Sequence, residues 1–243
     1  MPTASSLRER LAEGRRVTGL WSLLPGAATA ELVAGTGADY VVLDLQHGAL
    51  GEGELPGVTA AVVAAGSVPL VRTRSASAAD IGRALDLGAH GVVVPSVLGA
   101  DHARTVVAAC RYGPSGTRSA GRVSGGSDAP LVLPMVETAG ALDELDALLA
   151  LDGVDGLYVG PHDLSLSLGR AGEEDRDHLR QVISSVVARA VAAGVPIGVH
   201  AYDGAAAAGY AAKGATILTA TMDTTALSAA LAGHLRDARG TAG

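Results

Sequence analysis

The stretch LDLGAHGVVVPSV, residues 85–97, shows the unit from which the fold is built. A helical pattern ends at Gly88, and a continuous apolar run, Gly91–Pro95, follows at once. Glycine just past a helix and an uninterrupted apolar run are typical of a helix that leads into a parallel strand buried on both faces. The same helix stop recurs in AGTGADYVV (34–42), AAGVPIGV (192–199) and AKGATIL (212–218), so we predict a repeated βα fold.

Eight short apolar runs alternate with helical patterns along nearly the whole chain. The runs are Val17–Trp21, Tyr40–Leu45, Pro69–Thr73, Gly91–Pro95, Leu131–Glu137, Gly156–Gly160, Pro196–His200 and Thr216–Ala220. The helical patterns are Ala28–Thr36, Glu52–Ala65, Ala78–Leu87, Ala100–Arg111, Ala139–Ala150, Glu174–Ala193, Gly204–Lys213 and Thr224–Arg239. This alternation predicts one α/β domain over residues 1–243, a single (β/α)₈ TIM barrel. A doubly wound open sheet is the alternative, but no GxGxxG motif opens the first helix.

Composition and charge exclude several classes of protein. The net charge is −7, and no basic stripe with interleaved aromatic residues is present, so we expect no nucleic-acid partner. No stretch approaches the ~20 apolar residues that cross a bilayer, so we expect a cytoplasmic protein with no membrane partner. Cys110 is the only cysteine, which excludes an internal disulfide. Lys213 is the only lysine and lies at a predicted helix end, so we do not expect Schiff-base chemistry.

Two acidic residues lie where apolar strands should end. Glu137 closes LVLPMVE, and Asp163 follows LYVGP. A buried charge costs several kcal/mol unless it is paired or binds a metal, and the carboxyl ends of the strands carry the active site of a barrel. We therefore predict that Glu137 and Asp163 bind a hard divalent cation, best Mg²⁺ or Mn²⁺. The alternative is a pair of helix-capping or surface charges, and His162 and His200 flank the predicted site without an assigned role.

Other polar side chains follow the neighbouring strands. Arg72 could clamp a substrate carboxylate or stabilise an oxyanion through its planar guanidinium. His47 could transfer a proton near neutral pH. Asp44 could orient His47 or a water, or accept a hydrogen bond from a loop amide. Asp86 lies in the last turn of a predicted helix, where a negative charge is unfavourable, so a histidine or arginine partner would explain it.

With these residues in place, the chain resembles the class II pyruvate aldolases of the HpcH/HpaI aldolase/citrate lyase family over nearly its full length. The resemblance rests on GLWSLLPGAATAELVAGTGADYVVLDLQHG (19–48), LVRTRSAS (70–77), LDLGAHGVVVPSV (85–97), RYGPSGTRSAG (111–121) and MVETAGALDELDALLALDGVDGLYVGPHDLSLSLG (135–169).

The resemblance implies a lyase that uses a metal and a pyruvate enolate. Glu137 and Asp163 would bind Mg²⁺ or Mn²⁺, or alternatively Co²⁺ or Zn²⁺, and pyruvate would chelate that metal through its carboxylate and keto oxygens. Arg72 would stabilise the enolate oxygen, and His47 would act as the base through a water. The enolate would add to an aldehyde to give a 4-hydroxy-2-oxoacid, and cleavage would follow the reverse path.

The resemblance also implies a partner for the catalytic histidine, a binding site for the pyruvate carboxylate, and an oligomeric assembly. Asp86 is similar to a family acid that pairs with the catalytic histidine. The family forms hexamers of barrels that exchange their last helices, so we expect a homo-oligomer, a hexamer or a trimer, in which Thr224–Arg239 packs on a neighbour. The residues whose amides would help bind the pyruvate carboxylate are Gly160, Pro161, His162 and Asp163.

Three features depart from the family pattern. Gln46 stands where the family often has glutamate, although glutamine also occurs there. Met135 stands where a glutamine is common, and the stretch between Gly121 and Leu131 is shorter than in typical aldolases. Two alternatives therefore stay open. One is related enolate chemistry, a citrate-synthase-like condensation or oxaloacetate decarboxylation. The other is a catalytically silent barrel that binds a keto acid.

Overall fold

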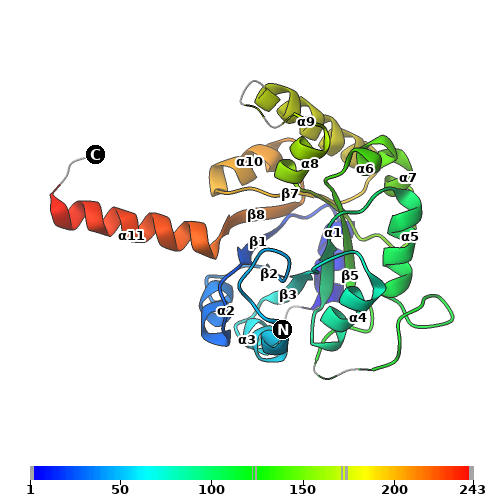
Figure 1. Cartoon of the computed structure of the whole chain (residues 1–243), viewed down its shortest axis with the longest axis horizontal. Helices are drawn as coiled ribbons and strands as arrows, with labels where there is room; N and C mark the ends of the chain where they lie inside the picture. Colours follow the sequence, from blue (N-terminus) through cyan, green and yellow to red (C-terminus); the bar gives the residue numbers. More distant parts are fainter. Residues whose placement is uncertain (1–2, 122, 124, 171, 173–174, 241–243) are drawn as a thin grey trace.

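A computed structural model describes residues 3–121, 123, 125–170, 172 and 175–240 of the chain. Eight parallel strands close into a barrel in chain order, and β8 pairs with β1 to complete it (Figure 1). The strands are β1 (Val17–Ser22), β2 (Tyr40–Asp44), β3 (Val68–Arg72), β4 (Gly91–Val94), β5 (Leu131–Val136), β6 (Leu157–Val159), β7 (Ile197–Val199) and β8 (Ile217–Met222). The predicted (β/α)₈ barrel is confirmed, and each strand starts and ends within two residues of its predicted bounds.

Helices connect the strands around the outside of the barrel. They are α1 (Ala4–Ala12), α2 (Ala27–Ala34), η1 (Glu52–Glu54), α3 (Leu55–Ala64), α4 (Ala78–Asp86), α5 (Ala100–Ala109), α6 (Ala139–Asp143), α7 (Leu145–Leu149), α8 (Pro161–Ser167), α9 (Arg176–Ala192), α10 (Gly204–Ala212) and α11 (Asp223–Arg239).

The helices depart from the predictions at three places. The predicted helix Ala139–Ala150 is broken at Glu144, whose carboxylate accepts a hydrogen bond of 2.7 Å from the backbone N–H of Ala100 at the start of α5. The predicted helix Glu52–Ala65 begins with the 3₁₀ turn η1. The short helix α8 was not predicted. Glu174, the predicted start of the helix that is α9, and two positions of the short 121–131 segment, residues 122 and 124, lie outside the described residues.

The core has two layers, one inside the barrel and one between the barrel and its helices. Along β2, Val42 points inward while Val41 and Leu43 belong to the outer layer, as the two-residue period of a strand requires. Helix α1 packs Leu7 and Leu11 against the inner layer. The large inner side chains are Trp21, Tyr40, Leu70, Leu133, Met135 and Tyr158. Since α1 and these side chains fill the barrel, the space for a ligand lies at the carboxyl ends of the strands.

Helix α11 extends away from the barrel (Figure 1). None of its residues is buried, and Leu227, Leu231 and Leu235 are about half exposed. These leucines recur every four residues, so they form one apolar stripe along the helix.

Within the part of the chain that the structure describes, no helix is both long and apolar enough to cross a bilayer.

Candidate active site

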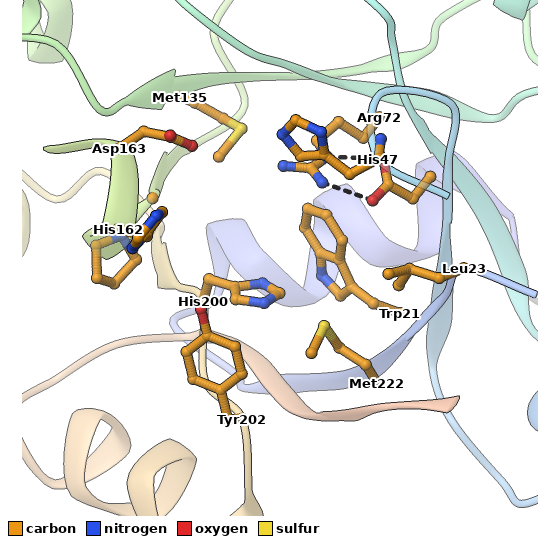
Figure 2. Close-up of a pocket in the computed structure, with 13 residues that line it drawn as sticks. Trp21, Leu23, His47, Arg72, Met135, His162, Asp163, His200, Tyr202 and Met222 are labelled. Carbon is orange, nitrogen blue, oxygen red and sulfur yellow. Dashed lines mark hydrogen bonds and ion pairs between the residues drawn. The ribbon is translucent and has the colours of Figure 1, made fainter. Parts of the chain in front are cut away.

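A cavity of about 230 Å³ opens at the carboxyl ends of the strands (Figure 2). Its walls come from the ends of seven strands, all but β4, and from the segments that follow them. The lining residues are Trp21, Leu23, Asp44, His47, Arg72, Met135, Gly160, Pro161, His162, Asp163, His200, Tyr202 and Met222. The cavity thus brings together most of the predicted site residues.

A buried ion pair between Asp44 and Arg72 forms one wall. The two residues lie opposite each other in the register of β2 and β3. Arg72 donates from Nε to Oδ1 at 2.9 Å and from Nη2 to Oδ2 at 2.5 Å. The guanidinium also lies over the ring of Trp21, at 4.6 Å from its centroid. This two-point contact fixes the plane of the guanidinium, so its remaining N–H groups have a defined direction.

Asp44 also holds the start of the loop that carries His47. Its Oδ1 accepts hydrogen bonds from the backbone N–H groups of Gln46 at 3.0 Å and His47 at 3.2 Å. Of the roles considered from sequence, the bond to loop amides is therefore observed, and the main side-chain partner of Asp44 is Arg72. The exposed ring of His47 lies beside Arg72 at the cavity (Figure 2).

Glu137 is buried directly after β5, and its two carboxylate oxygens differ in their hydrogen bonding. Oε1 accepts a hydrogen bond of 2.6 Å from the backbone N–H of Ser96, which adopts a left-handed conformation with φ of 56°. Oε2 is buried without a hydrogen-bond partner. Burial raises the pKa of Glu137, the negative charge of Asp163 raises it further, and the Ser96 N–H and the charge of Arg72 lower it. Glu137 and Asp163 thus interact as like charges, and one buried oxygen is free for a ligand.

The oxygen donors of Glu137 and Asp163 fit a hard cation, but they are few. Among the described residues, no group of three or more histidine, cysteine, aspartate or glutamate side chains is placed to hold a metal ion. A cation at this site would therefore take its other ligands from water and substrate oxygens, as Mg²⁺ commonly does.

Asp163 lies in the first turn of α8, which follows β6 directly. Gly160 caps this helix, and its lack of a side chain has a steric reason. A Cβ atom there would lie 2.4 Å from Oε2 of Glu137 and 2.9 Å from Cε of Met135. Pro161 has no N–H. The N–H groups that the first turn can offer are therefore those of His162 and Asp163, and Pro161 could act only by packing.

The opposite wall of the cavity carries His200, Tyr202 and Met222 beside Trp21 (Figure 2). The imidazole of His200 packs edge to face on Trp21, with ring centroids 4.6 Å apart, and on Tyr202 at 5.2 Å. Burial lowers the pKa of His200 to about 4, and the positive charge of Arg72 lowers it as well. This histidine is therefore neutral near pH 7.

Asp86 does not line this cavity. Its carboxylate accepts a hydrogen bond of 2.8 Å from the buried guanidinium of Arg118, and both residues line a separate cavity between α4 and α5. The sequence suggested a histidine or an arginine as the partner of Asp86, and the structure shows an arginine, Arg118. Within one chain, Asp86 does not lie beside His47. Its role beside His47 stays a prediction.

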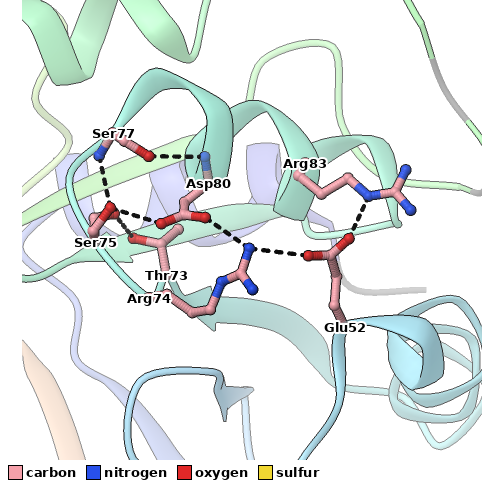
Figure 3. A network of polar contacts seen from close by, with 7 residues as sticks. All are labelled: Glu52, Thr73, Arg74, Ser75, Ser77, Asp80 and Arg83. Atoms are coloured by element: carbon pink, nitrogen blue, oxygen red, sulfur yellow. Dashed lines mark hydrogen bonds and ion pairs between the residues drawn. The ribbon is translucent and has the colours of Figure 1, made fainter.

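A network of charged side chains joins the loops after β2 and β3 at the rim (Figure 3). Arg74 contacts Glu52 at 3.1 Å and Asp80 at 2.9 Å, and Arg83 contacts Glu52 at 2.6 Å. Asp80 also accepts a bond of 2.6 Å from the hydroxyl of Ser75. Glu52 follows the His47 loop, so this network and the Asp44 contacts hold the loop from both sides.

Comparison with known proteins identifies the family of this chain. Residues 17–230 match the family model described as HpcH/HpaI aldolase/citrate lyase. The chain belongs to the HpcH/HpaI aldolase/citrate lyase family. The predicted resemblance is thereby confirmed, and so is the prediction of a carbon–carbon lyase of the pyruvate aldolase type.

Similar proteins cover nearly the whole chain. A hydroxypyruvate/pyruvate aldolase of Rhizorhabdus wittichii is 36% identical over 93% of this chain and 96% of its own. A 4-hydroxy-2-oxo-heptane-1,7-dioate aldolase of Salmonella arizonae is 33% identical over 92% and 90%. The crystal structure of an HpcH/HpaI aldolase/citrate lyase family protein from Burkholderia cenocepacia superposes with a TM-score of 0.90 at 30% identity, over 98% of this chain and 100% of that one.

Several residues of the site were missed from the sequence. Ser96 orients Glu137 through its backbone N–H, and only its place after the strand-four run could have indicated it. Trp21, Leu23 and Met222 line the cavity but look like ordinary core residues in the sequence. An apolar residue at a strand end can pack in the core or line the cavity, and the apolar pattern of the sequence is the same in both cases.

Proposed function

We propose that the protein reversibly cleaves a 4-hydroxy-2-oxoacid to pyruvate and an aldehyde. The observation that carries this proposal is the buried carboxylate of Glu137, whose unpartnered Oε2 shares the site with Asp163 and lies near the ion-paired Arg72. The names of the aldolase relatives support the same reaction.

The proposal includes a divalent cation held by Glu137 and Asp163, Mg²⁺ or Mn²⁺ first and Co²⁺ or Zn²⁺ as alternatives. The oxygen donors and the like charges of these two side chains support it. When bound, such a cation acts as a Lewis acid toward the oxygens of the keto acid.

Arg72 would hold the keto oxygen of the substrate. Its Nε and one hydrogen of Nη2 face Asp44, so Nη1 and the outer hydrogen of Nη2 remain for a ligand. A fixed guanidinium stabilises negative charge on an oxygen without having to reorganise. The N–H groups of His162 and Asp163, at the start of α8, would bind the carboxylate of the keto acid.

His47 would move the proton. Its ring lies at the cavity beside Arg72 (Figure 2), on a loop that Asp44 and the rim network hold. An imidazole at this position would take a methyl proton from pyruvate through a water and return it in the reverse direction.

We also propose that the protein is a homo-oligomer, a trimer or hexamer, in which α11 packs on a neighbouring copy. The exposed stripe of Leu227, Leu231 and Leu235 supports this assembly, since an apolar helix face is stable when another surface covers it. Replacing the three leucines with lysine should shift the sedimentation coefficient to that of a smaller species. An unchanged sedimentation coefficient would contradict the proposed packing.

The proposed reaction is tested by two assays on the unaltered protein. The first measures pyruvate release from a 4-hydroxy-2-oxoacid, and the second measures deuterium uptake by the pyruvate methyl group in D₂O. Both rates should fall at least about 100-fold after chelator treatment and recover with Mg²⁺ or Mn²⁺, as expected when a metal stabilises the developing charge.

Substitutions at two acidic positions separate the metal site from general charge effects. Glu137→Gln should reproduce the loss seen with chelator, whereas Asp146→Asn, on the surface of α7, should leave both rates unchanged. Full activity in the chelated protein would refute the metal site. Turnover of oxaloacetate in the absence of any aldehyde, with no cleavage of a 4-hydroxy-2-oxoacid, would instead favour the related enolate chemistry.

A further inference from the structure

His200 is a polar group of the cavity to which the proposed reaction gives no role. It follows β7 and lines the cavity beside Trp21, on the side opposite Asp163 (Figure 2). Its ring is held between Trp21 and Tyr202 by two edge-to-face contacts. A histidine fixed in this way presents one edge of its ring to whatever fills the cavity.

The two nitrogens of His200 have different surroundings. Nδ1 is buried without a hydrogen-bond partner, and the ring lines the cavity, so Nε2 is the nitrogen available to a ligand. Buried N–H groups that lack an acceptor are rarer in proteins than buried acceptor atoms that lack a donor. Nδ1 is therefore assigned as the unprotonated nitrogen. The proton of the neutral ring therefore belongs on Nε2, and His200 offers the cavity one N–H donor.

The position of this donor relates it to the second substrate. The groups proposed to hold the carboxylate and keto oxygen of pyruvate come from β3, from the segment after β5 and from α8. Pyruvate bound through those oxygens would direct its methyl carbon away from them, into the part of the cavity that His200, Tyr202 and Met222 line. The aldehyde would then meet the methyl carbon in that part of the cavity.

We propose that His200 binds the carbonyl oxygen of the aldehyde partner and donates a hydrogen bond to it from Nε2. This inference rests on the proposed function. As the enolate carbon forms its bond to the aldehyde carbon, the C=O π electrons move to the aldehyde oxygen, which becomes an alkoxide. A preorganised N–H at that oxygen stabilises the charge as it develops.

The proposed step balances without any further reactant. The pyruvate methyl group loses one proton, and the alkoxide gains one from water to become the 4-hydroxyl group. His200 keeps its own proton throughout, as a neutral imidazole can when it serves only as a hydrogen-bond donor. In the cleavage direction the same N–H stabilises the alkoxide from which the C–C bond breaks.

The test separates the aldol step from the formation of the enolate. Propanal is the probe aldehyde, because its carbonyl oxygen is its only polar atom, and deuterium uptake by pyruvate in D₂O measures enolate formation without any aldehyde. His200→Phe keeps a ring between Trp21 and Tyr202 but removes the N–H. We expect its kcat/KM for propanal to fall roughly 100-fold, as for the loss of one oxyanion donor, while deuterium uptake stays within about twofold.

Two further variants complete the test. His200→Gln retains an amide N–H and should recover kcat/KM to within about tenfold of the unaltered protein, a rescue that a purely structural role would not produce. His178→Phe, on the exposed surface of α9, should change neither rate. If His200→Phe does not fold by circular dichroism, His200→Leu repeats the measurement with a smaller side chain.

The outcomes distinguish this proposal from the proposed function. An unchanged aldol rate in the folded His200→Phe variant, or equal losses of the aldol rate and of deuterium uptake, would overturn the assignment of His200 alone. If the unaltered protein takes up no deuterium with Mg²⁺ or Mn²⁺ present, the proposed function fails and this assignment fails with it.

Discussion

The ion pair between Asp44 and Arg72 allows a quantitative prediction. Asp44 is completely buried and Arg72 nearly so. Asp44→Asn keeps Oδ1 for the two loop amides but places an NH₂ group where Oδ2 accepts from Nη2 at 2.5 Å. Two donors then face each other and the arginine loses its counter-charge, so we expect a loss of about 3–5 kcal/mol of unfolding free energy. Arg72→Met should cost a similar amount, since it leaves a buried carboxylate without its partner.

A double-mutant cycle isolates the interaction itself. The double variant Asp44→Asn/Arg72→Met removes both charges, so its loss should be smaller than the sum of the two single losses by about 3 kcal/mol. The assay is urea unfolding followed by far-UV circular dichroism, at one fixed protein concentration because an oligomer's stability depends on concentration. The surface pair Asp146 and Arg189, whose side chains are 85% and 39% exposed, is the matched control and should couple by less than about 0.5 kcal/mol. A coupling energy below about 1 kcal/mol for Asp44 and Arg72 would refute the reasoning, because the pair would then be solvated rather than buried.

Three further predictions follow from the site. Gly160→Ala places a Cβ against Oε2 of Glu137 and should weaken Mn²⁺ binding in calorimetry at least about tenfold, whereas Gly57→Ala, with open space around it, should leave binding unchanged and stabilise α3 by up to about 1 kcal/mol. Asp223, the first residue of α11, accepts hydrogen bonds from the Ser22 hydroxyl and from the backbone N–H groups of Leu23 and Leu24. These bonds tie the end of β1 to the start of α11, so Asp223→Asn should raise KM for propanal more than KM for pyruvate. An equal rise in both would contradict that role. The pKa of His200 is lowered from 6.5 to about 4, so the unfolded chain binds this proton more tightly. Stability should therefore fall as the pH drops from about 6.5 to about 4, by about 3 kcal/mol more than in His200→Phe, and parallel pH curves for the two proteins would contradict the shift.

The barrel could be predicted from the sequence because its signals are local. Each βα unit contains its own apolar run, helical pattern and glycine at the helix end, as in the stretch 85–97. These signals do not depend on the rest of the chain. The residue types at the strand ends, above all Glu137, Arg72 and His47, could also be found in this way. Each lies at the end of a buried run or in the residues just after it, where folding alone gives no reason for a polar side chain.

The pairing of those side chains could not be predicted, because it depends on contacts between distant segments. Asp44 meets Arg72 through the register of two neighbouring strands. Asp86 meets Arg118 through the fold of the loop after α5. A hydrogen bond between residues far apart in the chain leaves no periodic signal in the sequence.

The sequence alone determined the architecture of this protein and the chemistry of its strand ends, because both depend on short-range patterns of apolar, polar and glycine residues. Only the tertiary structure decided how the site is arranged. It placed the N–H of Ser96 against Glu137, left no room for a side chain at position 160, and placed His200 on the cavity wall between Trp21 and Tyr202. The physical reason is that the residues at the eight strand ends are far apart in the sequence. They become neighbours only when the strands close into a barrel.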